Sequence, residues 1–171
     1  MKKILLIMCA VMGLAFAANA QRPQIQLGYG GFTQMDCSNM HGGTPVNNAW
    51  GAMTAGLNLK VSPQLLMGMT YTFSSASYKD LPGANAYYHV LMFNGSYYYF
   101  SNSIVRLYAH AGIGVDITHM AYGDWRRDKS YVAFQASPLG AEVDINKGLS
   151  MFGELGYGAQ GLLQVGLRYT F

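Results

Sequence analysis

Residues 162–171 read Leu-Leu-Gln-Val-Gly-Leu-Arg-Tyr-Thr-Phe, and from Leu163 onward every second residue is apolar. Because successive side chains of a strand point to opposite faces, this stretch predicts a β-strand with one wholly apolar face and one polar face. The apolar face consists of Leu163, Val165, Leu167, Tyr169 and Phe171. In a soluble domain such a face is buried in a core, whereas in a membrane barrel it faces lipid and the polar face lines the interior.

The same alternation recurs along the chain and predicts eight strands. We expect them at about residues 24–34, 49–61, 65–75, 85–100, 105–118, 131–145, 149–158 and 162–171. The alternation over 105–118 has no error, while the pattern of the next strand changes face near Pro138. A β-bulge at Ser137–Pro138 reconciles its two halves, since a bulge inserts one unpaired residue. The expected fold is all-β: an eight-stranded antiparallel transmembrane β-barrel with an up-and-down meander.

The connections between these segments alternate in length. Short turns are expected at 62–64, 101–103 and 146–148, and longer loops at 35–48, 76–84 and 119–130, while the link at 160–161 is short. The short turns and both termini then lie at one end of the barrel. That asymmetry is typical of bacterial outer-membrane barrels, whose short turns face the periplasm and whose long loops face outward.

The first twenty residues have the features of a secretory signal peptide. Lys2 and Lys3 precede an apolar run at 4–16, and Ala18-Asn19-Ala20 matches a small-x-small cleavage site. The apolar run is too short to cross a bilayer as a helix. We therefore expect a cleaved signal peptide at 1–20, a single barrel domain at 21–171, and export from the cytoplasm.

The composition agrees with a membrane barrel better than with a soluble domain. Charged residues make up 11% of the chain, against roughly a quarter in ordinary proteins, and there are 21 glycines and 13 tyrosines. No stretch after residue 20 is long and apolar enough for a membrane helix. Without Lys2 and Lys3, nine basic and eight acidic residues remain, which gives no electrostatic footprint for nucleic acid. Cys37 is then the only cysteine, so no intramolecular disulfide is expected.

Three segments of the second half carry a resemblance to a known family. They are Ser-Pro-Leu-Gly-Ala-Glu at 137–142, Phe-Gly-Glu-Leu-Gly-Tyr-Gly at 152–158, and Gly-Leu-Arg-Tyr-Thr-Phe at 166–171. With the eight-strand rhythm, they resemble the small outer-membrane β-barrel proteins of Gram-negative bacteria, of the OmpA-barrel and OmpX type. The resemblance covers the whole mature chain. It implies an outer-membrane location and specifies architecture well, but it implies no particular reaction.

The resemblance also sets the expected partners. Outer-membrane lipid and lipopolysaccharide would surround the wall, and the barrel-assembly machinery would recognise the last strand, which ends in Phe171. We expect a monomer without cofactor or metal, and a passive structural or surface-interaction role.

Seven charged residues fall on the inward parity of the predicted strands. They are Lys60, Arg106, Asp116, Glu142, Asp144, Glu154 and Arg168. An eight-stranded lumen is about wide enough to be filled by side chains. Because an isolated buried charge is destabilising by several kcal/mol, these groups must pair, and the pairs predict a closed plug. A narrow proton or ion path along the same residues stays open as an alternative.

The predicted loop 119–130 is the most charged, and Trp125, Arg126 and Arg127 lie within it. Such residues form either a solvated loop tip or a contact with lipopolysaccharide phosphates or a protein ligand, because guanidinium groups bind phosphates strongly.

Two other classes of function remain. A lipid A-modifying enzyme of the outer membrane would need a nucleophile and a base, but the four histidines, His41, His89, His110 and His119, form no legible triad. A secreted lipocalin-like barrel would reverse the wall and place Arg106, Glu142 and Arg168 outside.

Overall fold

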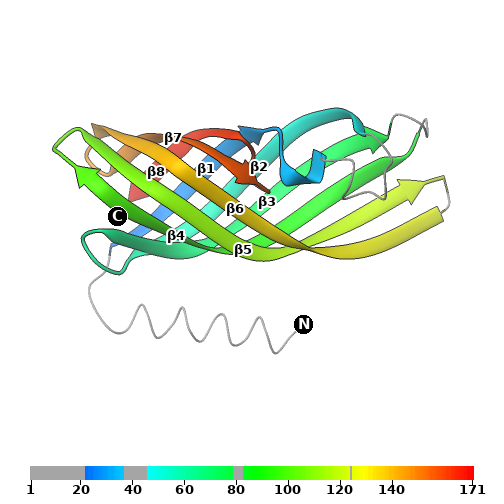
Figure 1. Ribbon diagram of the computed structural model, residues 1–171, viewed down its shortest axis with the longest axis horizontal. Helices are drawn as coiled ribbons and strands as arrows, with labels where there is room; N and C mark the ends of the chain where they lie inside the picture. Colours follow the sequence, from blue (N-terminus) through cyan, green and yellow to red (C-terminus); the bar gives the residue numbers. More distant parts are fainter. Residues whose placement is uncertain (1–21, 37–45, 79–82, 124) are drawn as a thin grey trace.

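The computed structural model describes residues 22–36, 46–78, 83–123 and 125–171, which form a closed antiparallel barrel in the order β1 to β8 (Figure 1). The strands are β1 (Pro23–Gly31), β2 (Val46–Lys60), β3 (Leu65–Tyr78), β4 (Asn85–Ser101), β5 (Val105–Tyr122), β6 (Trp125–Asn146), β7 (Leu149–Gly158) and β8 (Leu163–Thr170). One 3-10 turn, η1 (Gln34–Asp36), follows β1. The predicted fold class is confirmed. The signal peptide at 1–20 and Cys37 lie outside the described residues.

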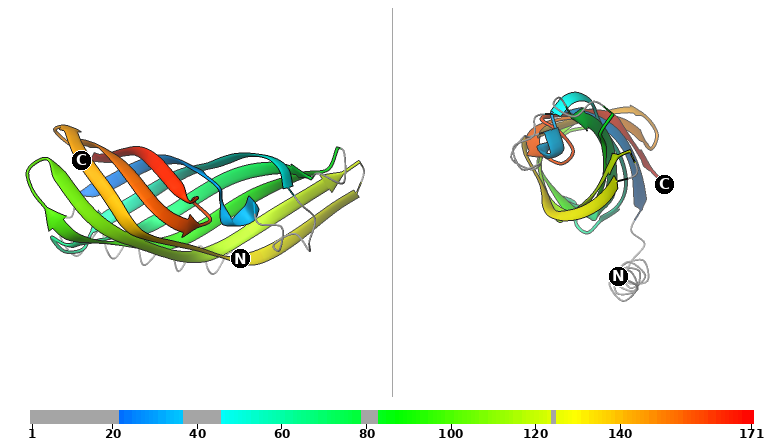
Figure 2. Two further views of the ribbon diagram at one scale, coloured as in Figure 1. Left: turned by 45° about the horizontal axis from the view of Figure 1, so that its top comes forward. Right: turned by 90° about the vertical axis from the view of Figure 1, so that its right-hand side faces the viewer.

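The first and last strands close the barrel by pairing with each other. Leu27 is opposite Leu167 and Gly28 is opposite Gly166 in the β1–β8 ladder. Viewed along the axis, the strands form a complete ring (Figure 2). Closure removes both sheet edges along this ladder, so backbone groups there are satisfied without water. In the ranges described, no helix is long and apolar enough to cross a membrane.

The two faces of β8 show which side of the wall is apolar. Val165 and Leu167 are 52% and 47% exposed, whereas Gln164 and Arg168 are each 1% exposed. Large apolar side chains are exposed in the same alternating way on all eight strands. A barrel with an apolar outer wall and a polar interior is a transmembrane barrel, which excludes the lipocalin-like arrangement.

Aromatic rings circle the outer wall towards the long-loop end. Neighbouring ring centroids from Tyr29 through Trp50, Phe73 and His89 to His119 lie 5.3–6.4 Å apart on β1 to β5. Aromatic girdles of this kind mark the membrane–water interface in barrels.

One predicted loop is wrong. Residues 119–130 were expected to be irregular, but β5 continues to Tyr122 and β6 begins at Trp125, so the two form one tall hairpin. The alternation disappears there because both faces of the hairpin tip meet solvent, whereas main-chain pairing continues without it. Similarly, β2 begins at Val46 and β3 ends at Tyr78, which shortens the predicted loops 35–48 and 76–84.

The predicted bulge in β6 is confirmed. Tyr108 is opposite Gly140 but His110 is opposite Ser137, and Ala136 and Leu139 flank a shift in the β6–β7 ladder. Pro138 sits in the bulge, where it has no ladder hydrogen bond to lose.

The upper lumen, towards the long-loop end, contains an apolar cluster that the sequence analysis did not anticipate. Met35 from η1 joins Tyr88, Val90 and Met92, whose side chains point inward from β4. The η1 turn is fixed by the Gln34 side chain, whose Nε2 donates to the Val132 carbonyl (3.0 Å) and whose Oε1 accepts from the Phe134 backbone N–H (3.2 Å). Both faces of β4 are therefore apolar at this level.

Phe152 breaks the polar pattern of the inner face because two glycines make room for its ring. Phe152 lies opposite Gly166 on β8, and Gly166 lies opposite Gly28 on β1. A Cβ added at Gly166 would sit 2.1 Å from the Leu27 carbonyl oxygen of β1 and 2.6 Å from the Phe152 ring, closer than real Cβ contacts, so there is no room for a methyl group at this contact between β8, β1 and Phe152.

We predict that Gly166→Ala destabilises the barrel by about 1–3 kcal/mol, because the added methyl group overpacks this contact. The heat-induced loss of the folded band in a detergent gel-shift assay measures the effect. Gly153→Ala is the matched control, since its Cβ would meet only the Gln164 carbonyl oxygen at 3.9 Å. Equal melting of the two variants would contradict the packing argument.

Candidate functional site

The barrel interior is organised around a buried cation on β8. Arg168 is 1% exposed and pairs with two carboxylates, Glu142 on β6 (Nη1–Oε2 2.9 Å) and Glu154 on β7 (Nη2–Oε1 3.2 Å). Its Nε donates to Gln26 Oε1 on β1 (3.3 Å). A guanidinium group has five fixed N–H donors, so one arginine can hold three strands at once.

Two aromatic rings flank the same guanidinium. The Arg168 Cζ atom lies 4.3 Å from the centroid of the Phe152 ring and 4.7 Å from that of Tyr108. Both contacts are within the range of cation–π attraction, which is strongest where water is excluded. Tyr108 in turn packs against Gly140, whose added Cβ would lie 2.5 Å from the ring.

Hydroxyl and imidazole groups satisfy the remaining oxygens of the two glutamates. Glu142 accepts from the hydroxyls of Tyr98 (2.7 Å) and Ser150 (2.5 Å). Glu154 accepts from the Tyr108 hydroxyl (2.7 Å) and contacts His110 Nδ1 (2.8 Å). Because every oxygen of both carboxylates has a partner, the buried charges avoid the penalty of desolvation without compensation.

The network continues towards the short-turn end through Arg106. Its Nη2 atom contacts Glu142 Oε1 (3.0 Å) and also Asp144, whose side chain is 42% exposed. The interactions therefore form one chain from Asp144 through Arg106, Glu142 and Arg168 to Glu154. We call these five residues the central network.

The structure brings together five of the seven predicted interior charges and leaves two apart. Lys60 lies at the end of β2 and forms no ion pair within the described part of the chain. Asp116 is buried higher in the lumen, where Oδ2 accepts from Thr118 (3.1 Å) and Oδ1 has no partner among the described residues. Lys60 and Asp116 therefore lie outside the central network, because parity fixes the face of a residue but not its height.

The sequence did not predict that polar side chains would complete the central network. Tyr98, Tyr108, His110 and Ser150 all share the inward parity of their strands, so the signal was present. What sequence could not give was their common level, since that depends on the stagger between strands and on the β6 bulge.

The predicted surface residues lie on a strand and not in a loop. Arg126 and Arg127 are exposed at the start of β6, opposite Ala121 and Met120. For Trp125, the structure describes the backbone position in β6 and not the side chain.

The described histidines do not meet in one place. His110 is buried in the lumen, while His89 and His119 meet edge to face on the outer wall with ring centroids 5.4 Å apart. His89 contacts the Tyr71 hydroxyl (2.7 Å) and His119 contacts Asp128 (2.7 Å). Across the described ranges, no group of three or more metal-binding side chains is arranged to hold an ion.

Among known proteins, only solved structures are similar to this chain, and the similarity concerns the fold. No protein-family model matches the sequence, and no curated protein matches it. Among solved structures, the chain is similar to Neisserial surface protein A, with a TM-score of 0.58, 9% identity, and coverage of 90% of this chain and 98% of that one. The fold is that of the small eight-stranded outer-membrane barrels. The N-terminal β-barrel domain of Pseudomonas aeruginosa OprF is also similar, with a TM-score of 0.51, 9% identity, and coverage of 88% and 97%.

We predict that Arg168→Ala lowers the stability of the folded barrel by about 3–5 kcal/mol, because Glu142 and Glu154 would lose their shared counter-charge in a buried site. Arg168→Lys should recover little of this loss, since an ammonium cannot reach both carboxylates and stack between two rings. The gel-shift melting temperature measures both variants. The exposed Arg126→Ala is the control and should leave it nearly unchanged.

Proposed function

We propose that this protein is an integral outer-membrane barrel with a structural or surface-interaction role, and that its lumen is closed to bulk solvent flow. The observation that carries the proposal is the central network, in which Arg168 ties β8 to the carboxylates of β6 and β7 while its guanidinium stacks on Tyr108 and Phe152. An eight-stranded barrel has an interior just wide enough to be filled by side chains, and at this level paired charges and aromatic rings occupy it.

A second obstruction supports the same proposal. The apolar cluster of Met35, Tyr88, Val90 and Met92 occupies the lumen above the central network. An ion that passed the network would next meet these side chains, which are 0–1% exposed and leave only the buried polar groups across from them, such as Asp116 and Thr72, to replace its hydration shell. The narrow-channel alternative therefore requires two independent rearrangements.

The outer-membrane location is supported by three features of the chain. The wall is apolar, the aromatic girdle marks one interface, and the short turns gather at the end where β1 begins and β8 ends (Figure 1). The predicted signal peptide at 1–20 supplies the route of export, and the last strand ending in Phe171 supplies the proposed signal for the barrel-assembly machinery. The barrel acts as a monomer in this proposal.

The surface-interaction role is assigned to the tall β5–β6 hairpin. His119 belongs to the aromatic girdle, and the hairpin continues beyond it to the turn between Tyr122 and Trp125. Arg126 and Arg127 are exposed on this extension, beyond the aromatic girdle. Charge-assisted contacts between these guanidinium groups and phosphates are the proposed interaction. No catalytic role is assigned to any residue.

Recording from planar bilayers tests the closed lumen. We predict no steady conductance when the purified wild-type barrel is inserted, because the central network and the apolar cluster block the axis. A porin of sixteen to eighteen strands, whose lumen is an aqueous channel, serves as the positive control in the same bilayers. Steady, porin-like conductance of the wild type would show that the lumen is open.

Thiol labelling of whole cells tests location and orientation together. Cys37 directly follows η1, which lies at the long-loop end of the barrel. The start of β1 and the end of β8 lie at the opposite, short-turn end. We predict that a membrane-impermeant thiol reagent labels Cys37 on intact cells. We also predict that the protein remains in the membrane fraction after cell lysis and is released only by detergent. Labelling only after lysis would place this end of the barrel in the periplasm.

A further inference from the structure

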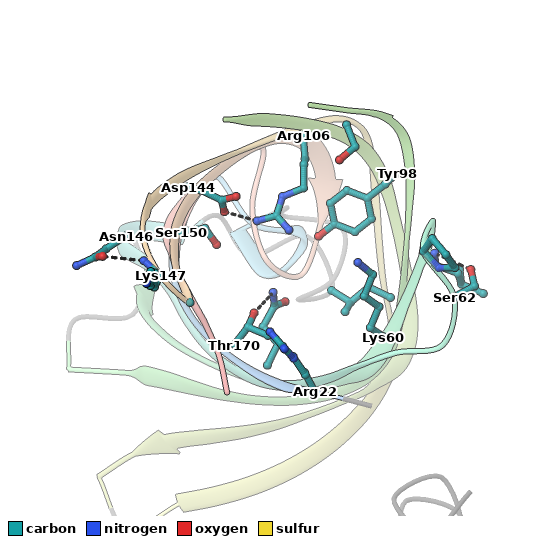
Figure 3. A pocket seen from close by; sticks show the side chains of 16 residues that line it. Arg22, Lys60, Ser62, Tyr98, Arg106, Asp144, Asn146, Lys147, Ser150 and Thr170 are labelled. Carbon is teal, nitrogen blue, oxygen red and sulfur yellow. Dashed lines mark hydrogen bonds and ion pairs between the residues drawn. The ribbon is translucent and has the colours of Figure 1, made fainter. Parts of the chain in front are cut away.

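A cavity of about 1010 Å³ opens at the short-turn end of the barrel, directly below the central network (Figure 3). We call it the vestibule. Its charged lining residues come from the start of β1, the end of β2, the first residues of β5, and the end of β6 with its turn: Arg22, Lys60, Arg106, Asp144 and Lys147. Its volume is that of a site for a small molecule.

The charges of the vestibule do not balance. Among the described residues that line it, four are cationic and one is a carboxylate. That carboxylate, Asp144, is already paired with Arg106. Arg22, Lys60 and Lys147 form no ion pair with any described residue. The contrast with the central network above is sharp, since there each cation has its counter-charge.

Two of the unpaired cations, Lys60 and Arg22, point into the vestibule and not into lipid (Figure 3). Lys60 shares the inward parity of Thr54 and Asn58, which are 2% and 4% exposed inside the barrel. Figure 3 shows the side chains of Lys60, Arg22 and Arg106 converging on the mouth from three sides. The Arg106 side chain is 25% exposed and lines the same cavity. A cleft lined by one sign of charge with low-dielectric walls concentrates counter-ions.

We propose that the vestibule is a binding site for a small polyanion, carrying two or more phosphate or carboxylate groups, that enters from the periplasmic side. Its negative groups would bridge Lys60 and Arg22 across the mouth and approach the exposed part of the Arg106 guanidinium. Hydroxyls of Ser62 and Ser101 line the same cavity and add neutral donors. The inference uses the orientation given above but not the closed lumen, so the bilayer result and the binding result are independent.

Titration of the refolded mature barrel in detergent micelles tests the site. Inorganic pyrophosphate and citrate serve as phosphate and carboxylate probes, and backbone amide NMR shifts at Lys60, Ser101 and Ser150 report binding. We predict saturable shifts at low ionic strength with at least one probe, weakened by added salt because the attraction is electrostatic. Which probe binds more tightly distinguishes a phosphorylated ligand from a polycarboxylate.

Matched variants distinguish a specific binding site in the vestibule from non-specific electrostatic attraction of the anion to the protein. Lys60→Gln and Arg22→Gln should each weaken binding about two- to fivefold, the range of a solvent-accessible ion pair, and the double variant should weaken it further. Arg126→Gln at the opposite end removes the same charge and should change nothing. Unchanged melting in the gel-shift assay shows that each variant is folded. Shifts that do not saturate with either probe, or equal binding by Lys60→Gln and Arg126→Gln, overturn the proposal.

Discussion

The structure depends on the burial of one guanidinium group in a closed barrel. Arg168 is fully enclosed, yet it keeps two carboxylate partners and two aromatic faces. Arg168 is buried among side chains that leave little room for water to solvate a lone charge, so the residues around it must be acids and hydrogen-bond acceptors or donors that complete the pairing. The positions of Glu142, Glu154, Tyr98 and Ser150 all follow from this requirement.

The same constraint shapes the wall around the network. Rings as large as Tyr108 and Phe152 fit inside only where the facing strands carry Gly140 and Gly166, because a Cβ at either position would meet a ring carbon within 2.5–2.6 Å. The bulge at Ser137–Pro138 changes the face of β6. Because of it, Ser137, which lies opposite His110 before the bulge, and Glu142 after it both point inward. Glycines and bulge thus serve the packing of the lumen as well as the curvature of the sheet.

The two ends of the lumen have different chemistry. Above the central network, the inward side chains of β4 meet Met35 from η1 and form an apolar cluster. Below it, the vestibule is open and cationic. The height of the wall also varies around the barrel, since β5 and β6 have 18 and 22 residues while β7 and β8 have 10 and 8. The tall side carries Arg126 and Arg127 beyond the aromatic girdle, which is where contacts with other molecules outside the membrane are proposed.

The sequence by itself determined the number of strands, their faces, the short turns and the bulge at Pro138, because the two-residue period of a strand is written directly in the order of apolar and polar residues. It also determined that Arg168, Glu142 and Glu154 point inward. It failed where both faces of a hairpin meet water, as at residues 119–130, since pairing there leaves no apolar pattern. Only the tertiary structure decided which inward residues share a level: Arg106 joins the central network, whereas Lys60 and Asp116 do not. The physical reason is that height in a barrel is set by the stagger between strands, and stagger depends on hydrogen-bond register around the whole ring and not on any one strand.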